Sequence, residues 1–264
     1  MYSNEEKRLT PREWRERFRE GEVRPTVGLA EGFVQLHLVV LPQEQAFDFL
    51  LYCQRNPLAC PLVEMLEPGT FTSQKMAPGA NLGTDLPLYR IFEKGVLKGE
   101  ADNIKDMWNN KMVAFLLGCG LSVDQFLLEV GIPVRHLEEG QFGSIFITNL
   151  ETAAAGIFRG PIAVSMRPVA GEKVAKAVQI TSRFPAFHGE PIYIGDPGFI
   201  GIQDLQKPDF GTPLTIKKGE TPVFWACGVT AQLSALCGKV DFMITQAPSH
   251  MLITDIRSAS MAAY

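Results

Sequence analysis

Residues 33–55 read FVQLHLVVLPQEQAFDFLLYCQR, and this stretch decides the fold. Its first nine residues, 33–41, are mostly apolar and rich in branched side chains, and they predict a buried β-strand. Pro42 opens a predicted helix that continues through Gln54. The side chains expected to face the core from this helix are Ala46, Phe47, Phe49, Leu50 and Cys53. A buried strand that leads directly into such a helix favours a layered α/β domain.

The alternation of strands and helices continues on both sides of this stretch. Thr10, Pro11 and Glu13 form a capping-box pattern, which predicts a surface helix that runs to about Glu20. Further strands are predicted at residues 111–117, 222–226, 240–245 and 251–254, helices at 123–130 and 231–236, and a hairpin over 89–98. The short connections between these elements support the same α/β class.

The middle of the chain has a different character, because residues 132–219 are rich in glycine and proline. Its predicted elements are short strands at 144–148 and 161–166 and an amphipathic helix at 172–182. We interpret residues 132–219 as a smaller α+β domain inserted into the main one. The main α/β domain would then be discontinuous and comprise residues 1–131 and 220–264.

The composition is that of a folded protein without a nucleic-acid or membrane partner. The 264 residues are 46% hydrophobic and 20% charged, and the net charge of −4 lacks the basic excess of nucleic-acid binders. The N-terminal segment is charged, and the apolar runs are far shorter than the ~20 residues of a membrane span, so neither a secretory signal nor a membrane anchor is expected. Five cysteines without a CxxC pair indicate reduced thiols and a cytoplasmic protein. The sequence leaves open whether the chain forms a homo-oligomer.

The common cofactor motifs are absent from the sequence. It contains no GxxxxGK[ST], GxGxxG, HExxH or GxSxG. We therefore expect a reaction without ATP or a nicotinamide, and no cofactor. Metal-ligand spacing is absent too, and Asp85, Asp196, Asp255 and His250 would form a metal site only if the fold brought them together.

Two short segments, residues 115–125 (FLLGCGLSVDQ) and 224–232 (FWACGVTAQ), share one pattern. In each, an apolar strand ends in Cys-Gly, and an apolar residue and then Ser or Thr lead into a helix. We predict that the glycine permits an unusual backbone turn and that the hydroxyl caps the helix. The residues concerned are Cys119, Gly120 and Ser122 in the first junction, and Cys227, Gly228 and Thr230 in the second.

These junctions are the first candidate for a binding site. The start of a helix carries unpaired N–H groups and the positive end of the helix dipole. Each junction is therefore predicted to form a small anion site beside a thiol, and the two together could hold two carboxylates, or one carboxylate and an oxyanion. The alternative is that Cys119 and Cys227 are inert buried hydrophobic residues and that the glycines serve only the turn.

Four further charged residues are candidate catalysts or ligands. Asp85 and Arg90 flank a proline turn, and the planar guanidinium of Arg90 suits a carboxylate. Arg135 and Arg167 each end an apolar stretch and are candidate carboxylate ligands as well. The alternatives are a turn-capping role for Asp85 and solvated arginines.

His250 is the candidate acid or base that titrates near neutral pH. It lies between two predicted strands in the segment 244–255 (ITQAPSHMLITD), and loops fixed by rigid strands often carry reactive groups. Asp255 would face the opposite side of a straight strand, so it is not an obvious partner for His250. The alternative is a hydrogen-bonded structural histidine.

Ten segments of the chain, among them GFVQLHLVVLP, TDLPLYR, MVAFLLGCGLS, PVFWACGVTAQ and ITQAPSHMLITD, resemble in order the hydro-lyase family related to D-glutamate cyclase. The resemblance spans nearly the whole chain. It implies an α/β protein of two domains with a hydro-lyase function. The one activity tied to the family is loss of water from D-glutamate to give 5-oxo-D-proline, and a stand-alone domain need not keep that substrate.

The chain departs from the family pattern at four positions. His37 stands where asparagine is usual, Ala231 where proline is usual, Gln246 where histidine is usual, and Ser249 where glycine is usual. The glutamine at position 246 removes a second histidine near His250, which argues against a two-histidine acid–base pair or metal site there.

One mechanistic hypothesis combines these interpretations. A small carboxylic or amino acid, D-glutamate above all, would be anchored by Arg90 or Arg135, with the junctions at Cys119 and Cys227 around its γ-carboxyl group. Asp85 and His250 would share the base and acid roles. The competing hypotheses are a catalytically silent protein that binds a small carboxylic acid, and a hydro-lyase that eliminates water from a different acid.

Overall fold

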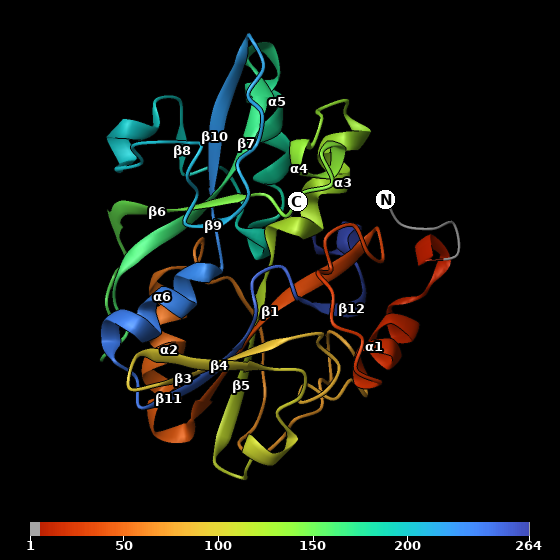
Figure 1. The fold of residues 1–264 in the computed structure, drawn as a ribbon, viewed down its shortest axis with the longest axis vertical. Helices are drawn as coiled ribbons and strands as arrows, with labels where there is room; N and C mark the ends of the chain where they lie inside the picture. Colours follow the sequence, from red (N-terminus) through yellow and green to blue (C-terminus); the bar gives the residue numbers. More distant parts are fainter. Residues whose placement is uncertain (1–5, 264) are drawn as a thin grey trace.

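A computed structural model describes residues 6–263 of the chain, and strand β1 (Phe33–Pro42) lies at the centre of its first sheet (Figure 1). The side chains of β1 alternate between two cores, with Leu36 and Leu38 in one and Val39 and Leu41 in the other. Both faces of the strand are therefore buried. This explains why its sequence reads as a nearly continuous apolar run.

The first sheet is built outward from β1. β5 (Met112–Gly118) pairs along one side, and on the other side β12 (Leu252–Arg257) pairs with the first half of β1 and β11 (Phe242–Gln246) with its second half. The remaining strands are β2 (Leu62–Met65) beside β5, and β3 (Tyr89–Glu93) and β4 (Val96–Ala101) beyond β11. All these pairs are antiparallel.

Helices cover one face of this sheet and an irregular segment covers the other. α2 (Gln43–Arg55) and α6 (Val229–Gly238) contribute to the core that contains Val39. Residues 66–86 pack on the opposite face through apolar side chains such as Leu82.

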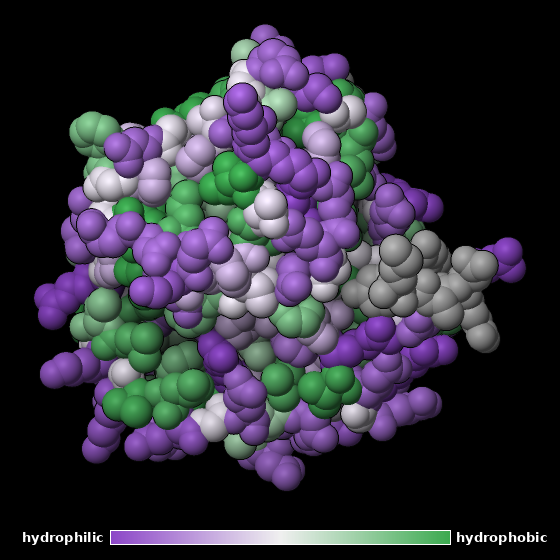
Figure 2. Space-filling view, turned by 45° about the horizontal axis from the view of Figure 1, so that its top comes forward, coloured by the Kyte–Doolittle hydropathy of each residue, from purple (hydrophilic) through white to green (hydrophobic). Residues whose placement is uncertain are grey.

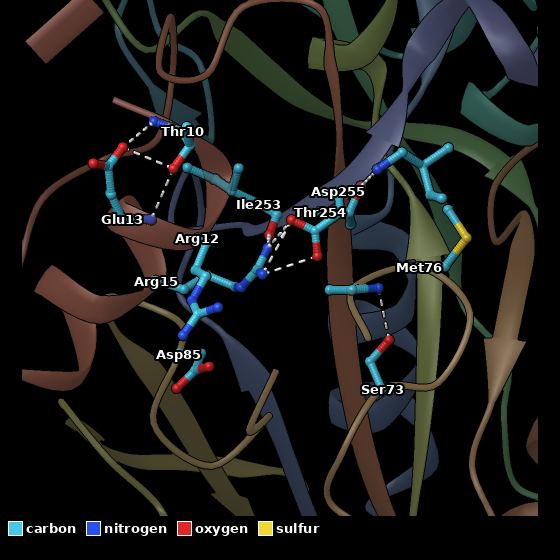
Figure 3. Close-up of polar contacts among 12 residues, drawn as sticks. Thr10, Arg12, Glu13, Arg15, Ser73, Met76, Asp85, Ile253, Thr254 and Asp255 are labelled. Atoms are coloured by element: carbon cyan, nitrogen blue, oxygen red, sulfur yellow. Dashed lines mark hydrogen bonds and ion pairs between the residues drawn. The ribbon is translucent and has the colours of Figure 1, made fainter. Parts of the chain in front are cut away.

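α1 (Pro11–Arg19) lies against the outer strand β12 and begins as predicted. Thr10 Oγ1 accepts a hydrogen bond from the N–H of Glu13, and the Glu13 carboxylate accepts one from the N–H of Thr10 (Figure 3). This reciprocal pair satisfies two N–H groups that a helix start leaves unpaired. Trp14 is fully buried and anchors the helix to the body of the protein.

The second sheet contains the strands from the middle of the chain (Figure 1). β7 (Pro161–Ala170) is its central strand and pairs with β6 (Ser144–Glu151) and β10 (Glu220–Ala226), again antiparallel. The edge strands are β8 (Tyr193–Ile194) and β9 (Phe210–Gly211). α6 lies between the two sheets, because it packs on β7 as well as on the first sheet.

Short helices complete the described part of the chain. The α-helices are α3 (Asp124–Glu129), α4 (Arg135–Glu138) and α5 (Val174–Thr181). The 3₁₀ helices are η1 (Glu6–Arg8), η2 (Lys105–Met107), η3 (Gly120–Val123), η4 (Gly171–Lys173), η5 (Pro185–Phe187), η6 (Pro197–Ile200) and η7 (Ser258–Met261).

The predicted α/β class is confirmed, and each predicted strand and helix is present with small shifts at its ends. Two details differ from the sequence-based expectation. β10 pairs within the second sheet, although the predicted boundary assigned residues from 220 onward to the main domain. Phe47 is 72% exposed, because the buried side of α2 follows Ala46, Phe49 and Cys53 instead. The division into two domains stays a prediction.

On the face shown in Figure 2, hydrophilic residues separate several smaller apolar areas. Among the helices of residues 6–263, none combines the length and the apolar character needed to cross a membrane.

Candidate functional site

The two Cys-Gly junctions line one cavity of about 60 Å³, here called the Cys119–Cys227 cavity. Cys119 follows β5 of the first sheet and Cys227 follows β10 of the second, so the cavity lies where the two sheets meet. The polar side chains in its wall include His37, Arg167 and His188, together with His136, Ser144, Ser165 and Ser249. The fold thus brings together the two segments that share a sequence pattern.

The glycine of the second junction provides space rather than an unusual turn. Gly228 has a φ of −64°, which any residue adopts, so the predicted conformational need for glycine is wrong there. A Cβ atom at Gly228 would overlap the imidazole of His37. At Gly120, a Cβ atom would lie 3.6 Å from Nη2 of Arg167 and 3.8 Å from Cδ2 of His188. Each junction therefore has a histidine next to its glycine.

The two junction hydroxyls bond to neighbouring strands instead of capping helices. Ser122 Oγ accepts a hydrogen bond from the N–H of Gln35 at 2.9 Å and donates one to the carbonyl of Gln35 at 3.3 Å. Thr230 Oγ1 donates to the carbonyl of Cys227 at 2.7 Å and accepts from the N–H of Ala163 at 3.0 Å. Both hydroxyls are engaged inside the protein, so the predicted helix caps are wrong, and the predicted ligand-binding roles stay predictions.

Both thiols of the cavity are buried and protonated at neutral pH. Burial raises the pKa of Cys119 to about 12 and the pKa of Cys227 to about 11. The N–H groups of Leu121 and Val229 donate to these sulfurs, and the charge of Arg167 also favours the thiolates, but burial outweighs both effects. A protonated thiol is a poor nucleophile. The thiols therefore suit the cavity wall as neutral groups.

His37 lies on β1, lines the cavity and is only 5% exposed. Burial, with a smaller effect of His188, lowers its pKa to about 3, so the ring is neutral at neutral pH. Its Nδ1 lies 2.6 Å from Nε2 of Gln246, at the end of β11. Its Nε2 has no hydrogen-bond partner among residues 6–263. Because an unpaired buried polar atom is costly, a ligand that reached this nitrogen would gain a hydrogen bond.

His188 is held in the cavity wall by the turn that ends η5. Its backbone has a φ of +75°, the left-handed region in which non-glycine residues are uncommon and often functional. Nδ1 lies 2.7 Å from the carbonyl oxygen of Leu58, and burial lowers the pKa of the ring to about 4. Gly118 allows this turn to approach β5, because a Cβ atom there would overlap the carbonyl oxygen of Ala186.

Arg167 provides the buried positive charge of the cavity. Its Nε and Nη2 donate to Oδ1 of Asp124 at 3.0 and 2.7 Å. The second hydrogen of Nη2 is donated to the carbonyl of Gly120 at 3.1 Å, and Nη1 donates to Ser165 Oγ at 3.3 Å. These contacts use four of the five guanidinium hydrogens, so within the described chain one Nη1–H is left for a ligand.

Asp124 keeps Arg167 in place. Burial alone would raise the pKa of its carboxyl group, but the charge of Arg167 and the contact with His136 hold that pKa below its usual value. The second carboxylate oxygen accepts from Nε2 of His136 at 2.9 Å. The position of Arg167 agrees with its predicted role as a carboxylate ligand.

Asp85 lies outside this cavity, next to α1 (Figure 3). Its side chain is fully buried, and its two oxygens accept from Nε and Nη2 of Arg19 at 2.9 and 2.6 Å. They also accept from the N–H of Asn81 and the hydroxyl of Thr84. These contacts fasten α1 to the segment that carries Asp85, away from the cavity.

Three other predicted site residues also lie outside the cavity. Arg90 on β3 forms an ion pair with Glu100 at 2.9 Å, and the buried Arg135 forms one with Glu220. His250 is half-buried, and its Nδ1–H donates at 2.8 Å to the carbonyl two residues earlier. Burial lowers the pKa of this ring. The loop before His250 lines the cavity, but its ring does not, so the predicted roles of these three side chains are not supported by their positions.

The aspartates that were candidates for a metal site are dispersed. Asp255 pairs with Arg15 of α1 at 2.9 Å, as Figure 3 shows, and Asp196 accepts from the N–H of Gly198 in its own turn. In the part of the chain that the structure describes, no group of three or more His, Cys, Asp or Glu side chains is arranged to hold a metal ion.

The chain belongs to the D-glutamate cyclase family, whose sequence profile matches residues 113–255. A protein of Geobacillus kaustophilus is 52% identical over 96% of this chain and 97% of its own length. A protein of Thermoanaerobacter sp. is 52% identical over 96% of both chains, and one of Stutzerimonas stutzeri is 49% identical over 96% of both. Each of these three relatives is named "Putative hydro-lyase".

Sequence reasoning missed His37, His188 and Gln246 as members of the site. His37 stands inside an apolar strand, and His188 stands in a segment that reads as a turn. His37 and Gln246 contact each other across 209 residues of sequence. A contact between residues so far apart leaves no local pattern in the sequence.

Proposed function

We propose that this protein is a hydro-lyase that removes water from a small amino acid with two carboxyl groups, with the conversion of D-glutamate to 5-oxo-D-proline as the first candidate reaction. One observation carries the proposal. The Cys119–Cys227 cavity combines a buried cation, Arg167, with two neutral imidazoles. The names of the relatives support the hydro-lyase class, and the description of the family supports D-glutamate as substrate.

The candidate reaction needs an anchor, a base and an acid. The substrate nitrogen attacks the γ-carboxyl carbon, a C–N bond forms, and a C–O bond breaks. Two hydrogens leave the nitrogen and depart with the carboxyl oxygen as water, so no oxidant, reductant or net proton is required. The protein has to accept a proton from the nitrogen and deliver one to the oxygen, which typically accelerates a reaction about 100- to 10,000-fold.

The cavity residues match these tasks. Arg167 would anchor a carboxylate through its charge and its remaining Nη1–H. One of the two rings would take the proton from the nitrogen and return it to the leaving oxygen, and the other would hold the carboxyl oxygen through an N–H hydrogen bond. The two thiols would close the wall around the reacting carboxyl group. Holding the amine and the carboxyl group at attack distance lowers the barrier by up to ~7–11 kcal/mol in favourable cases.

Product analysis tests this proposal. The purified protein is incubated with D-glutamate and, separately, with L-glutamate, and 5-oxoproline is measured by chiral chromatography and mass spectrometry. We expect water loss from D-glutamate that Arg167→Met abolishes and Arg135→Met retains, because Arg135 is an equally buried, ion-paired arginine outside the cavity. Binding of D-glutamate without any product would favour the silent binding protein. An unsaturated product from another acid would indicate elimination instead.

A further inference from the structure

We infer that Gln246 is a positioning residue that makes His37 the hydrogen-bond donor of the Cys119–Cys227 cavity, opposite His188 as the acceptor. The identity of the ligand rests on the proposed function. The polarity of the two rings does not, because it follows from hydrogen bonds within the protein.

The orientation of the Gln246 amide is fixed by the backbone of β1. The N–H of Leu38 lies 2.8 Å from Oε1 of Gln246, and an N–H group can only donate. The amide nitrogen of Gln246 therefore faces His37, whose Nδ1 lies 2.6 Å away. Because that nitrogen is also a donor, Nδ1 of His37 has to accept. The single hydrogen of the neutral ring is then on Nε2, the atom without a partner in residues 6–263.

The opposite reasoning applies to His188. Its Nδ1 lies 2.7 Å from the carbonyl oxygen of Leu58, and a carbonyl oxygen can only accept. Nδ1 of His188 therefore carries the hydrogen, and Nε2 keeps its lone pair. The two rings lie 6.1 Å apart between centroids, nearly at right angles. In the ligand-free protein, burial keeps both rings neutral near neutral pH.

This fixed polarity selects a class of ligand. An N–H of His37 suits a carboxyl or carbonyl oxygen, and a lone pair of His188 suits an N–H group. Glutamate and its lactam offer both groups. Glutarate, a dicarboxylate of the same chain length, has a C–H where glutamate has its amino group and leaves the lone pair of His188 without a donor. The cavity should therefore prefer amino acids to plain dicarboxylates, although Arg167 attracts both.

Gln246→Glu tests the inference directly. A carboxylate can still accept from Leu38, but its second oxygen can only accept from His37, so Nδ1 of His37 has to gain a proton. We expect ¹⁵N NMR of the ligand-free protein to show Nε2–H and a bare Nδ1 at His37 in the unmodified protein, and a protonated Nδ1 in the variant. The His188 signals should stay the same. Gln54→Glu, which adds the same charge on the exposed side of α2, should leave both rings unchanged.

Binding measurements complete the test. In the unmodified protein, D-glutamate should bind at least about tenfold more tightly than glutarate, the effect of one hydrogen bond to a charged group. In Gln246→Glu, at a pH where NMR shows a neutral His37, D-glutamate should bind at least about tenfold more weakly than in the unmodified protein. A protonated Nδ1 at His37 in the unmodified protein, or equal affinity for the two acids, would overturn the inference. The expected NMR pattern with no lactam formed would remove the proposed activity and leave the inference standing.

Discussion

Lowering the pH from 7 to 5 is expected to destabilise the protein through its two buried cavity histidines. Burial lowers the pKa of His37 to about 3 and the pKa of His188 to about 4, from 6.5 for an unperturbed histidine. Between these values the unfolded chain binds more protons than the folded chain, so acid favours unfolding. The stability that the two neutral rings contribute is fully present above about pH 6.5. It declines as the pH falls below that value, and the loss is complete below about pH 4 for His188 and below about pH 3 for His37.

The size of the effect follows from the same pKa values. One pKa unit corresponds to about 1.4 kcal/mol, so the complete shifts amount to roughly 3 kcal/mol for His188 and roughly 5 kcal/mol for His37. From pH 7 to pH 5 both folded-state pKa values lie below the interval, and each ring should lower the free energy of unfolding by about 2 kcal/mol. The rings repel each other when charged, so each is best measured alone.

Urea unfolding at pH 7 and pH 5 measures this loss in the unmodified protein, His37→Asn and His188→Asn. Each variant lacks one titrating ring, so its unfolding free energy should fall by about 2 kcal/mol less between the two pH values. His250→Asn is the matched control, and its effect should be smaller because that ring is only half-buried. A pH dependence that is the same in the unmodified protein and in both cavity variants would refute the description of these rings as buried and neutral.

Three further predictions concern single substitutions. Gly228→Ala should lower the free energy of unfolding in urea by about 1–3 kcal/mol, because the added methyl group overlaps the imidazole of His37. Gly99→Ala, whose methyl group meets no atom within 4 Å, should leave it nearly unchanged. Equal losses in the two variants would contradict the steric argument. Arg167→Met and Arg135→Met should each lower the free energy of unfolding by about 3–5 kcal/mol, because each leaves a carboxylate without its cation. In calorimetry only Arg167→Met should abolish D-glutamate binding, and loss of binding in both variants would contradict the site. Thr10→Ala should cost about 1 kcal/mol through loss of the helix cap and leave D-glutamate binding unchanged; weaker binding would link α1 to the site.

The sequence predicts the fold well because its signals are local. The apolar run of β1 and the capping box at Thr10 are read within a few residues, and both are present. The strand partners are not local, so the pairing of β10 with β7 did not follow from the alternation of strands and helices. The exposure of Phe47 shows a similar limit, because the buried side of a helix depends on what packs against it.

Two sequence signals pointed to the candidate cavity, namely the repeated Cys-Gly pattern and Arg167 at the end of an apolar stretch. The shared Cys-Gly pattern pointed to Cys119 and Cys227, which line one cavity. The charged residues near turns were misleading, because Asp85 is neutralised by Arg19, a residue 66 positions earlier. Long-range partners of this kind decide whether a charged side chain is free to act. A single sequence does not encode such pairs in any local pattern, and His37 and His188 were missed for the same reason.

A crystal structure of the protein with D-glutamate or 5-oxo-D-proline is the most direct test of the central claim. The account predicts the ligand in the Cys119–Cys227 cavity, with a carboxylate at Nη1 of Arg167 and an oxygen within hydrogen-bond distance of Nε2 of His37. A ligand bound at Arg90 or His250, with the cavity empty, would contradict it.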